Sequence, residues 1–133
     1  MTEDNLLEAF SRYKVKPANR ARSALTNDRA LVLSCTYARF HRAQSGVLRY
    51  EEDLSGETGS STGLLRTHLA DALTNELEIR LIVAVTGHVP SLETARGATR
   101  PGPRSFHVRK DLVGRVTFFD GERFVVEFRK AES

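Results

Sequence analysis

A set of polar residues between positions 37 and 53 could bind an anion or carry out acid–base chemistry. The set consists of Tyr37, Arg39, His41, Arg49, Glu51 and Asp53. An arginine guanidinium can bind a carboxylate or a phosphate through two parallel hydrogen bonds. Alternatively, His41 and Glu51 could exchange a proton with a substrate, as in a small hydrolase. Both hypotheses require these side chains to share one surface.

Residues 30–41 and 47–54 must supply that surface. The first segment, ALVLSCTYARFH, starts with apolar residues and then alternates, and the second, VLRYEEDL, returns after a turn at residues 44–46. This pattern predicts two strands of a β-hairpin. The expected cross-strand neighbours are His41 and Arg49, Arg39 and Glu51, Tyr37 and Asp53, and, on the other face, Phe40 and Tyr50. The alternative interpretation is a solvated face with cross-strand ion pairs.

A second candidate surface is the basic segment 96–110. Its charged residues are Arg96, Arg100, Arg104, Arg109 and Lys110, and it also contains His107. The prolines and glycines of residues 87–104 predict a mobile surface loop. A flexible basic arm could lie along a nucleic-acid phosphate backbone, although Phe106 alone offers little base stacking. The alternative is a charged loop on a mildly basic protein.

The sequence carries no motif for a metal or a cofactor. Residues 55–63, SGETGSSTG, precede a predicted helix and could bind an anion through backbone N–H groups. They lack the signatures of nucleotide-binding loops, which favours a flexible loop with a helix cap. His68 has no second histidine at metal-binding spacing. We therefore predict no metal, no cofactor and no catalytic residue.

Composition narrows the class of protein. The chain has 133 residues, 40% of them hydrophobic, which is enough for one domain with a core. Its net charge of +3 permits contact with nucleic acid or an acidic partner, but solubility alone explains it. Cys35 is the only cysteine, which fits a reducing compartment. The acidic start and the absence of a long apolar run predict a cytoplasmic protein without a membrane span.

Residues 113–129 provide the clearest structural prediction. Their sequence, VGRVTFFDGERFVVEFR, alternates around an Asp-Gly turn and predicts a β-hairpin. A three-residue loop at 119–121 would place Gly121 at a positive φ. The residues expected on one buried face are Val116, Phe118, Phe124, Val126 and Phe128. The unbroken apolar run 81–85 predicts a central strand that is buried on both faces.

Two helices complete the expected fold. The first, residues 2–14 with Thr2 as its cap, would bury Leu6, Leu7, Phe10 and Tyr13. The second, capped within residues 60–62 and ended by a left-handed Asn75, would bury Leu65, Leu69, Ala72 and Leu73. Residues 18–29 have no clear pattern. We predict a single α+β domain, with a mostly antiparallel sheet of two β-hairpins plus a central strand, packed by two helices.

The layout, with ALVLSCTYARF early and DLVGRVTFFDGERFVVEFR at the end, resembles small α+β proteins carried on integron gene cassettes. The resemblance implies an accessory protein and assigns no site residues. We predict a non-enzymatic protein that binds a small anionic molecule or an acidic protein surface. The alternatives are a nucleic-acid-binding protein that uses residues 96–110 and a small hydrolase that uses His41 and Glu51. A homodimer formed through a sheet edge or face is a further hypothesis.

Overall fold

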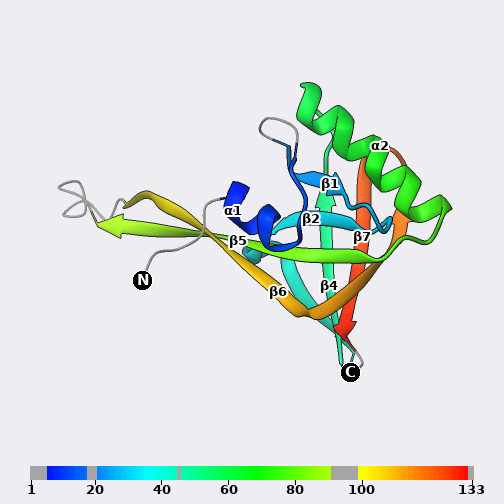
Figure 1. Cartoon of the computed structure of the whole chain (residues 1–133). Helices are drawn as coiled ribbons and strands as arrows, with labels where there is room; N and C mark the ends of the chain where they lie inside the picture. The colour runs from blue at the N-terminus through cyan, green and yellow to red at the C-terminus, as the bar shows by residue number, and fades with distance from the viewer. Residues whose placement is uncertain (1–5, 18–20, 45, 91–98, 132–133) are drawn as a thin grey trace.

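The computed structural model describes residues 6–17, 21–44, 46–90 and 99–131 (Figure 1). Its elements are α1 (Leu6–Arg12), β1 (Ser23–Leu25), β2 (Leu31–Thr36), the 3-10 helix η1 (Tyr37–Arg39), β3 (Phe40–Gln44), β4 (Val47–Asp53), α2 (Ser60–Thr74), β5 (Ile79–Pro90), β6 (Thr99–Phe119) and β7 (Arg123–Lys130).

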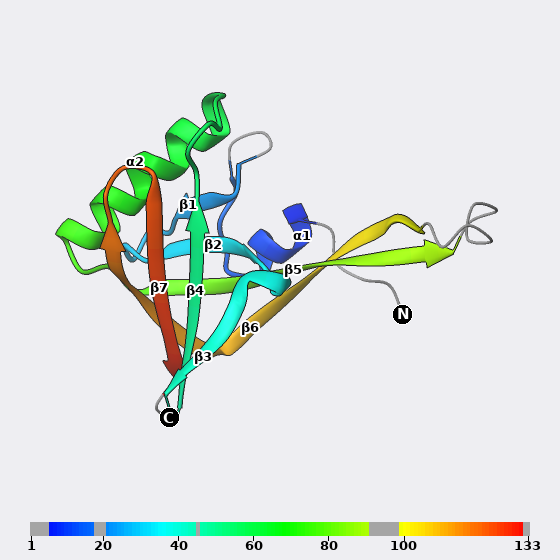
Figure 2. The same cartoon turned by 180° about the vertical axis from the view of Figure 1, so that it is seen from behind.

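The described strands form one seven-stranded sheet in the order β1-β2-β5-β6-β7-β4-β3. Strands β2 and β5 are parallel, and the other neighbours in the sheet are antiparallel. The sheet curves strongly, with α2 across one face and α1 packed on the other (Figures 1 and 2). The predicted α+β class with a mostly antiparallel sheet and two helices is confirmed. The strand connections go beyond two hairpins, because β5 and β6 are also antiparallel neighbours.

Strands β2 and β5 are buried on both faces. In β2, Leu31 and Leu33 belong to the core under α2, whereas Val32 belongs to the core under α1. In β5, Leu81 and Ile82 divide between the two cores in the same way. Because β5 also lies between β2 and β6, the prediction of a central strand is confirmed.

The prediction of one long strand over residues 30–41 is wrong. Strand β2 ends at Thr36, η1 follows, and β3 begins at Phe40 near the opposite edge of the sheet. A strand that is apolar on both faces needs a neighbour on each side, whereas the polar β3 is suited to an edge. The chain therefore crosses from one part of the sheet to the other within three residues of 3-10 helix.

The register of β3 and β4 retains part of the predicted hairpin. The pairs Phe40–Tyr50 and His41–Arg49 are confirmed. The predicted cross-strand pairs of Tyr37 and Arg39 do not form, because both residues lie in η1. The hairpin is therefore shorter than predicted.

The final hairpin places the predicted apolar residues on one buried face, except for Phe118. The core under α2 includes Val116, Phe124, Val126 and Phe128. The register shifts between Val116 and Phe118, so Phe118 turns outward and is 44% exposed, while Phe119 packs against the core. The turn lies at residues 120–122, one position later than predicted, and Gly121 has the expected positive φ of 100°.

Most of each predicted helical stripe is confirmed: Phe10 and Tyr13 are buried in the first, and Leu65, Leu69 and Ala72 in the second. In α1, Ala9 and Phe10 are buried, whereas Leu7 is 63% exposed. In α2, His68 is buried and Leu73 is exposed. Leu6, Ala9, Phe10 and Tyr13 follow the i, i+3, i+4, i+7 spacing of one helix face, and Leu7 lies outside that face. The predicted cap Thr2 lies outside the described residues.

The ends of α2 also differ from the prediction. Its N-cap is Gly59, so none of the predicted hydroxyl residues 60–62 caps the helix. The left-handed residue after the helix is Glu76, with φ of 52°, whereas Asn75 has φ of −105°. The predicted boundaries are close, but the capping chemistry is not the one that the serines and Asn75 indicated.

Two segments that were expected to be irregular form strands. Residues 23–25 form β1, which pairs with β2 at the sheet edge. Residues 87–90 and 99–104, predicted to be a loop, extend β5 and β6 as a paired ribbon. This ribbon projects from the rest of the sheet (Figures 1 and 2). Residues 91–98 lie outside the described residues.

Candidate functional site

Part of the predicted polar set forms an ion-pair network on the outer face of β4. His41 Nε2 lies 3.3 Å from Glu51 Oε2, and Arg49 Nη2 lies 3.0 Å from Glu127 Oε2. Arg123 Nη2 donates to Glu51 Oε1 at 2.9 Å, and this hydrogen bond lowers the pKa of Glu51. The arginines here are already paired with carboxylates, as the ion-pair interpretation predicted. Glu127 and Arg123 were missed because only the sheet order places β7 beside β4.

The His41–Glu51 pair has the separation that proton exchange between the two groups would need. The His41 side chain is 51% exposed, and Arg123 keeps Glu51 ionised. A hydrolase would also need a substrate site next to this pair, and Glu51 does not line either of the two cavities described below. The hydrolase hypothesis stays a prediction.

A concave pocket of about 690 Å³ lies on the α2 face of the sheet. Its walls come from η1, β3 and β4 on one side and from β5 and β6 on the other, and η1 contacts β5. The apolar lining residues are Ala38, Phe40, Leu48, Leu81, Val83 and Val85. The polar lining residues are Tyr37, His41, Arg42, His107 and Arg109. The apolar residues other than Ala38 are buried or half-buried, whereas the polar ones are exposed, so the pocket has an apolar floor and a polar rim.

The charged residues that line this concave pocket are cationic, and Arg42 has no carboxylate partner among the described residues. Arg42 and Arg109 are cationic, and none of the described lining residues is an aspartate or glutamate. Arg109 is held in place by Asp111, through two hydrogen bonds of 2.8 and 2.7 Å. His107 Nε2 lies 3.0 Å from the Ser105 hydroxyl. An anionic group at the rim would meet cations and hydrogen-bond donors.

The pocket unites residues that the sequence predicts for different sites. Tyr37 and His41 come from the predicted polar set, and Arg109 comes from the basic segment. Of the remaining candidates, Arg39, Arg49 and Glu51 do not line the pocket, Lys110 lines a cavity on the opposite face, and Arg96 lies outside the described residues. Arg100 and Arg104 lie on the projecting ribbon.

Arg42 is a lining residue that sequence reasoning missed, whereas His107, like Arg109, belongs to the basic segment. Alternation along β5 shows that Leu81, Val83 and Val85 share one face of this strand, which is the face that lines the pocket. Their partners on β6 include His107, opposite Val83, and the β5–β6 register is needed to see this.

Arg22 and Glu52 form a largely buried ion pair. Arg22 donates to both carboxylate oxygens of Glu52, at 2.8 and 2.9 Å, and to the Ser34 carbonyl at 3.0 Å. Tyr50 donates its hydroxyl proton to Glu52 and accepts the Thr36 N–H at 3.1 Å. Burial raises the pKa of Glu52, but the hydrogen bond and charge of Arg22 lower it more, so the net pKa is below its ordinary value. These contacts leave the carboxylate fully bonded, which indicates a structural role.

A second buried polar pair joins α2 to β1. The Ser23 hydroxyl lies 2.7 Å from His68 Nδ1, and Ser23 is fully buried. Burial lowers the pKa of His68, and the nearby Asp71 carboxylate offsets only part of this effect. Because Ser23 is inaccessible to a substrate, this serine–histidine pair holds the helix on the sheet.

His68 is expected to make stability depend on pH. Its pKa is lower in the folded state, so below pH about 6.5 the unfolded chain binds the proton first and the free energy of unfolding falls. Urea denaturation at pH 7.0 and 5.5 should show this loss in the wild type. His68→Gln should reduce the difference between the two pH values. If the wild type and His68→Gln lost the same free energy of unfolding between pH 7.0 and pH 5.5, His68 would not be the cause of the loss.

Among the described residues, no three histidine, cysteine, aspartate or glutamate side chains lie close enough to hold a metal ion. None of the helices in the described part of the chain is both long and apolar enough to cross a membrane. No family model matches the sequence, and comparisons with curated proteins and with solved structures found no significant match. The resemblance to integron-cassette proteins therefore stays a prediction.

Proposed function

We propose that this protein is a non-enzymatic binding protein for a small amphipathic anion, which occupies the concave pocket. The observation that carries the proposal is the apolar floor beneath a rim of Arg42, His107 and Arg109, with no carboxylate among the described lining residues. Concave, mostly apolar sites with a few convergent polar groups are typical of small-molecule binding. A flat acidic protein surface would not reach the floor of such a pocket.

The two parts of the pocket would make different contributions to binding. The apolar part of the ligand would pack on Leu48, Val83 and Val85, at roughly 25 cal/mol for each Å² removed from water. The anionic group would contact Arg42 at the rim, which has no carboxylate partner among the described residues. A charged hydrogen bond of this kind contributes about 1.5–3 kcal/mol.

Titration calorimetry with decanoate and with decanol tests this proposal. The two probes share an apolar chain, and only decanoate carries a charge. We expect the wild type to bind decanoate more tightly, and Arg42→Gln to weaken decanoate binding by roughly tenfold or more. Decanol binding should change little, because the floor is intact.

Arg49→Gln is the matched control, because it removes an arginine from the outer face of the same hairpin. It should leave decanoate binding unchanged. If Arg49→Gln abolished binding while Arg42→Gln did not, the anion site would lie in the outer ion-pair network. A wild type that binds neither probe would refute the proposal.

The projecting ribbon favours nucleic-acid binding as a second candidate function. A two-stranded β-ribbon is narrow enough to enter the major groove of DNA, and residues 99–104 of this ribbon include Arg100 and Arg104. Fluorescence anisotropy with a DNA duplex at low and high salt tests it. Replacement of both arginines by alanine should weaken binding and reduce its salt dependence. Equal binding by the variant would exclude this role for the ribbon.

A further inference from the structure

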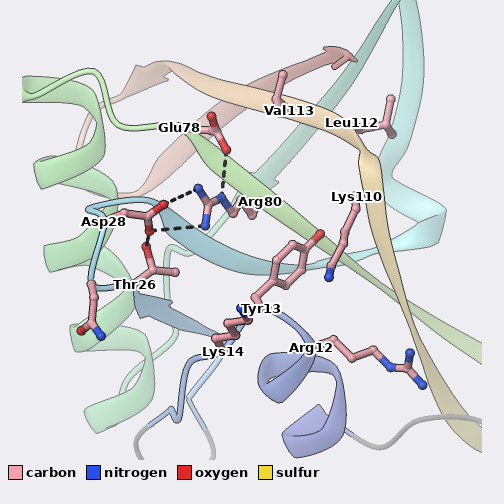
Figure 3. A pocket seen from close by; sticks show the side chains of 11 residues that line it. Arg12, Tyr13, Lys14, Thr26, Asp28, Glu78, Arg80, Lys110, Leu112 and Val113 are labelled. Atoms are coloured by element: carbon pink, nitrogen blue, oxygen red, sulfur yellow. Dashed lines mark hydrogen bonds and ion pairs between the residues drawn. The ribbon is translucent and has the colours of Figure 1, made fainter. Parts of the chain in front are cut away.

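A second cavity, of about 520 Å³, lies on the α1 face of the sheet (Figure 3). It is formed by the end of α1, the β1–β2 turn, the start of β5 and a bulged part of β6. The lining residues include four cations, Arg12, Lys14, Arg80 and Lys110, and two carboxylates, Asp28 and Glu78. The balance of charge in this cavity is therefore positive.

Both carboxylates of the cavity are bonded to the same arginine. Arg80 Nη2 donates to Asp28 Oδ2 at 2.8 Å, and Arg80 Nε donates to Glu78 Oε2 at 2.9 Å. The hydrogen bond from Arg80 lowers the pKa of Asp28 to about 2, so this group is ionised at neutral pH. Figure 3 shows these three side chains joined on one side of the cavity. Neither Lys14 nor Lys110 has a carboxylate partner among the described residues.

Tyr13 forms a fixed wall of the cavity. Its hydroxyl donates to the Leu81 carbonyl at 2.8 Å, and burial raises the pKa of Tyr13 to about 12, so the phenol stays neutral. Lys110 Nζ lies 5.7 Å from the centre of the Tyr13 ring, and Figure 3 shows the lysine beside the ring. This contact holds a cation at the cavity without neutralising it.

Lys14 occupies a position where a side chain is unfavourable. Its φ is 61°, in the left-handed region that glycine adopts more readily. The chain reverses here after α1, with the Lys14 N–H donating to the Ser11 carbonyl at 2.8 Å. Glycine is the common residue at such a helix end. The lysine at this point lines the cavity together with a second lysine, Lys110.

We propose that this cavity binds a phosphate monoester. The ammonium groups of Lys14 and Lys110 contact the phosphate, because lysine serves as a point charge for phosphate and two lysines match a dianion. The organic group of the ester packs on the Tyr13 ring, Leu112 and Val113. The site is on the opposite face from the concave pocket, so it does not depend on the proposed function.

Titration with phenyl phosphate and benzoate at constant ionic strength tests the site. Both probes carry a phenyl ring, and they differ in the anionic group. We expect phenyl phosphate to bind the wild type and raise its Tm, and benzoate to bind much more weakly. Lys14→Gly and Lys110→Gln should each weaken phenyl phosphate binding by roughly tenfold. Without ligand, the Tm of Lys14→Gly should equal or exceed that of the wild type, because glycine relieves the backbone conformation.

Arg29→Gly is the matched control for Lys14→Gly. Arg29 is an exposed cation with a similar φ of 63°, and it does not line the cavity. Its replacement should leave phenyl phosphate binding unchanged. Every variant is measured in an Arg42→Gln background, which removes the cation through which the concave pocket would bind the same probe. The proposal is overturned if the wild type does not bind phenyl phosphate, if benzoate binds equally well, or if Arg29→Gly weakens binding as much as Lys14→Gly.

Discussion

Arg22→Met is expected to lower the free energy of unfolding by about 3 kcal/mol, because it leaves the buried Glu52 carboxylate without its cation. Methionine retains most of the apolar stem of arginine, so the effect arises mainly from the lost charge and hydrogen bonds. The remaining exposure of Arg22, 27% of its side chain, places the expected value at the lower end of the range for buried pairs. Urea denaturation at pH 7 measures this change.

Two controls separate the buried charge from a general effect of losing an arginine. Arg123→Met removes an exposed partner of Glu51 and should lower the free energy of unfolding much less than Arg22→Met does, because solvent screens an exposed ion pair. The double variant Arg22→Met with Glu52→Gln should be more stable than Arg22→Met alone, since no unpaired carboxylate remains buried. If Arg22→Met and Arg123→Met lowered the free energy of unfolding equally, the Arg22–Glu52 pair would stabilise the fold no more than an exposed ion pair does.

The effect of Arg22→Met should also depend on pH. The pKa of Glu52 is lowered in the folded state, so the stabilisation it contributes is present above the unfolded pKa of about 4.3 and is lost as pH falls below it. The difference in stability between wild type and Arg22→Met should therefore narrow between pH 5 and pH 3. A constant difference over this range would contradict the ionised state of Glu52.

Gly114→Ala is expected to lower the free energy of unfolding by about 1–3 kcal/mol, through overpacking. A Cβ atom at Gly114 would lie 2.6 Å from Cδ1 of Phe128 and 3.1 Å from Cγ1 of Val126. Gly114 and Phe128 are direct cross-strand partners, and Phe128 is fully buried, so the ring cannot move into solvent. The same denaturation measurement tests this expectation.

Phe128→Leu provides the internal test of the Gly114 contact. Gly114→Ala should cost less in the Phe128→Leu background than in the wild type, because the smaller side chain leaves room for the new methyl group. Gly63→Ala is the matched control: a Cβ there meets no atom within 4 Å, and it lies inside α2. That substitution should stabilise the protein by up to about 1 kcal/mol. A similar loss at both glycines would contradict the packing explanation.

The sequence by itself determined the elements whose pattern depends only on local periodicity. The unbroken apolar run from Leu81 identified the central strand, because a strand covered on both faces has no polar positions. Alternation in the final hairpin placed Val116, Phe124 and Val126 on one face, and the Asp-Gly turn located the positive φ of Gly121. The one error there, at Phe118, comes from a bulge that alternation cannot reveal.

Only the tertiary structure decided which strands are neighbours and therefore which side chains meet. The sequence of residues 30–41 predicts one strand, but β2 and β3 lie in different parts of the sheet, because the apolar β2 needs cover on both faces and the polar β3 does not. Charged partners such as Arg22 and Glu52 are thirty residues apart in the chain. The concave pocket likewise combines η1, β3 and β4 with β5 and β6. Local periodicity specifies the face of a strand, whereas sheet order depends on the burial of all strands at once.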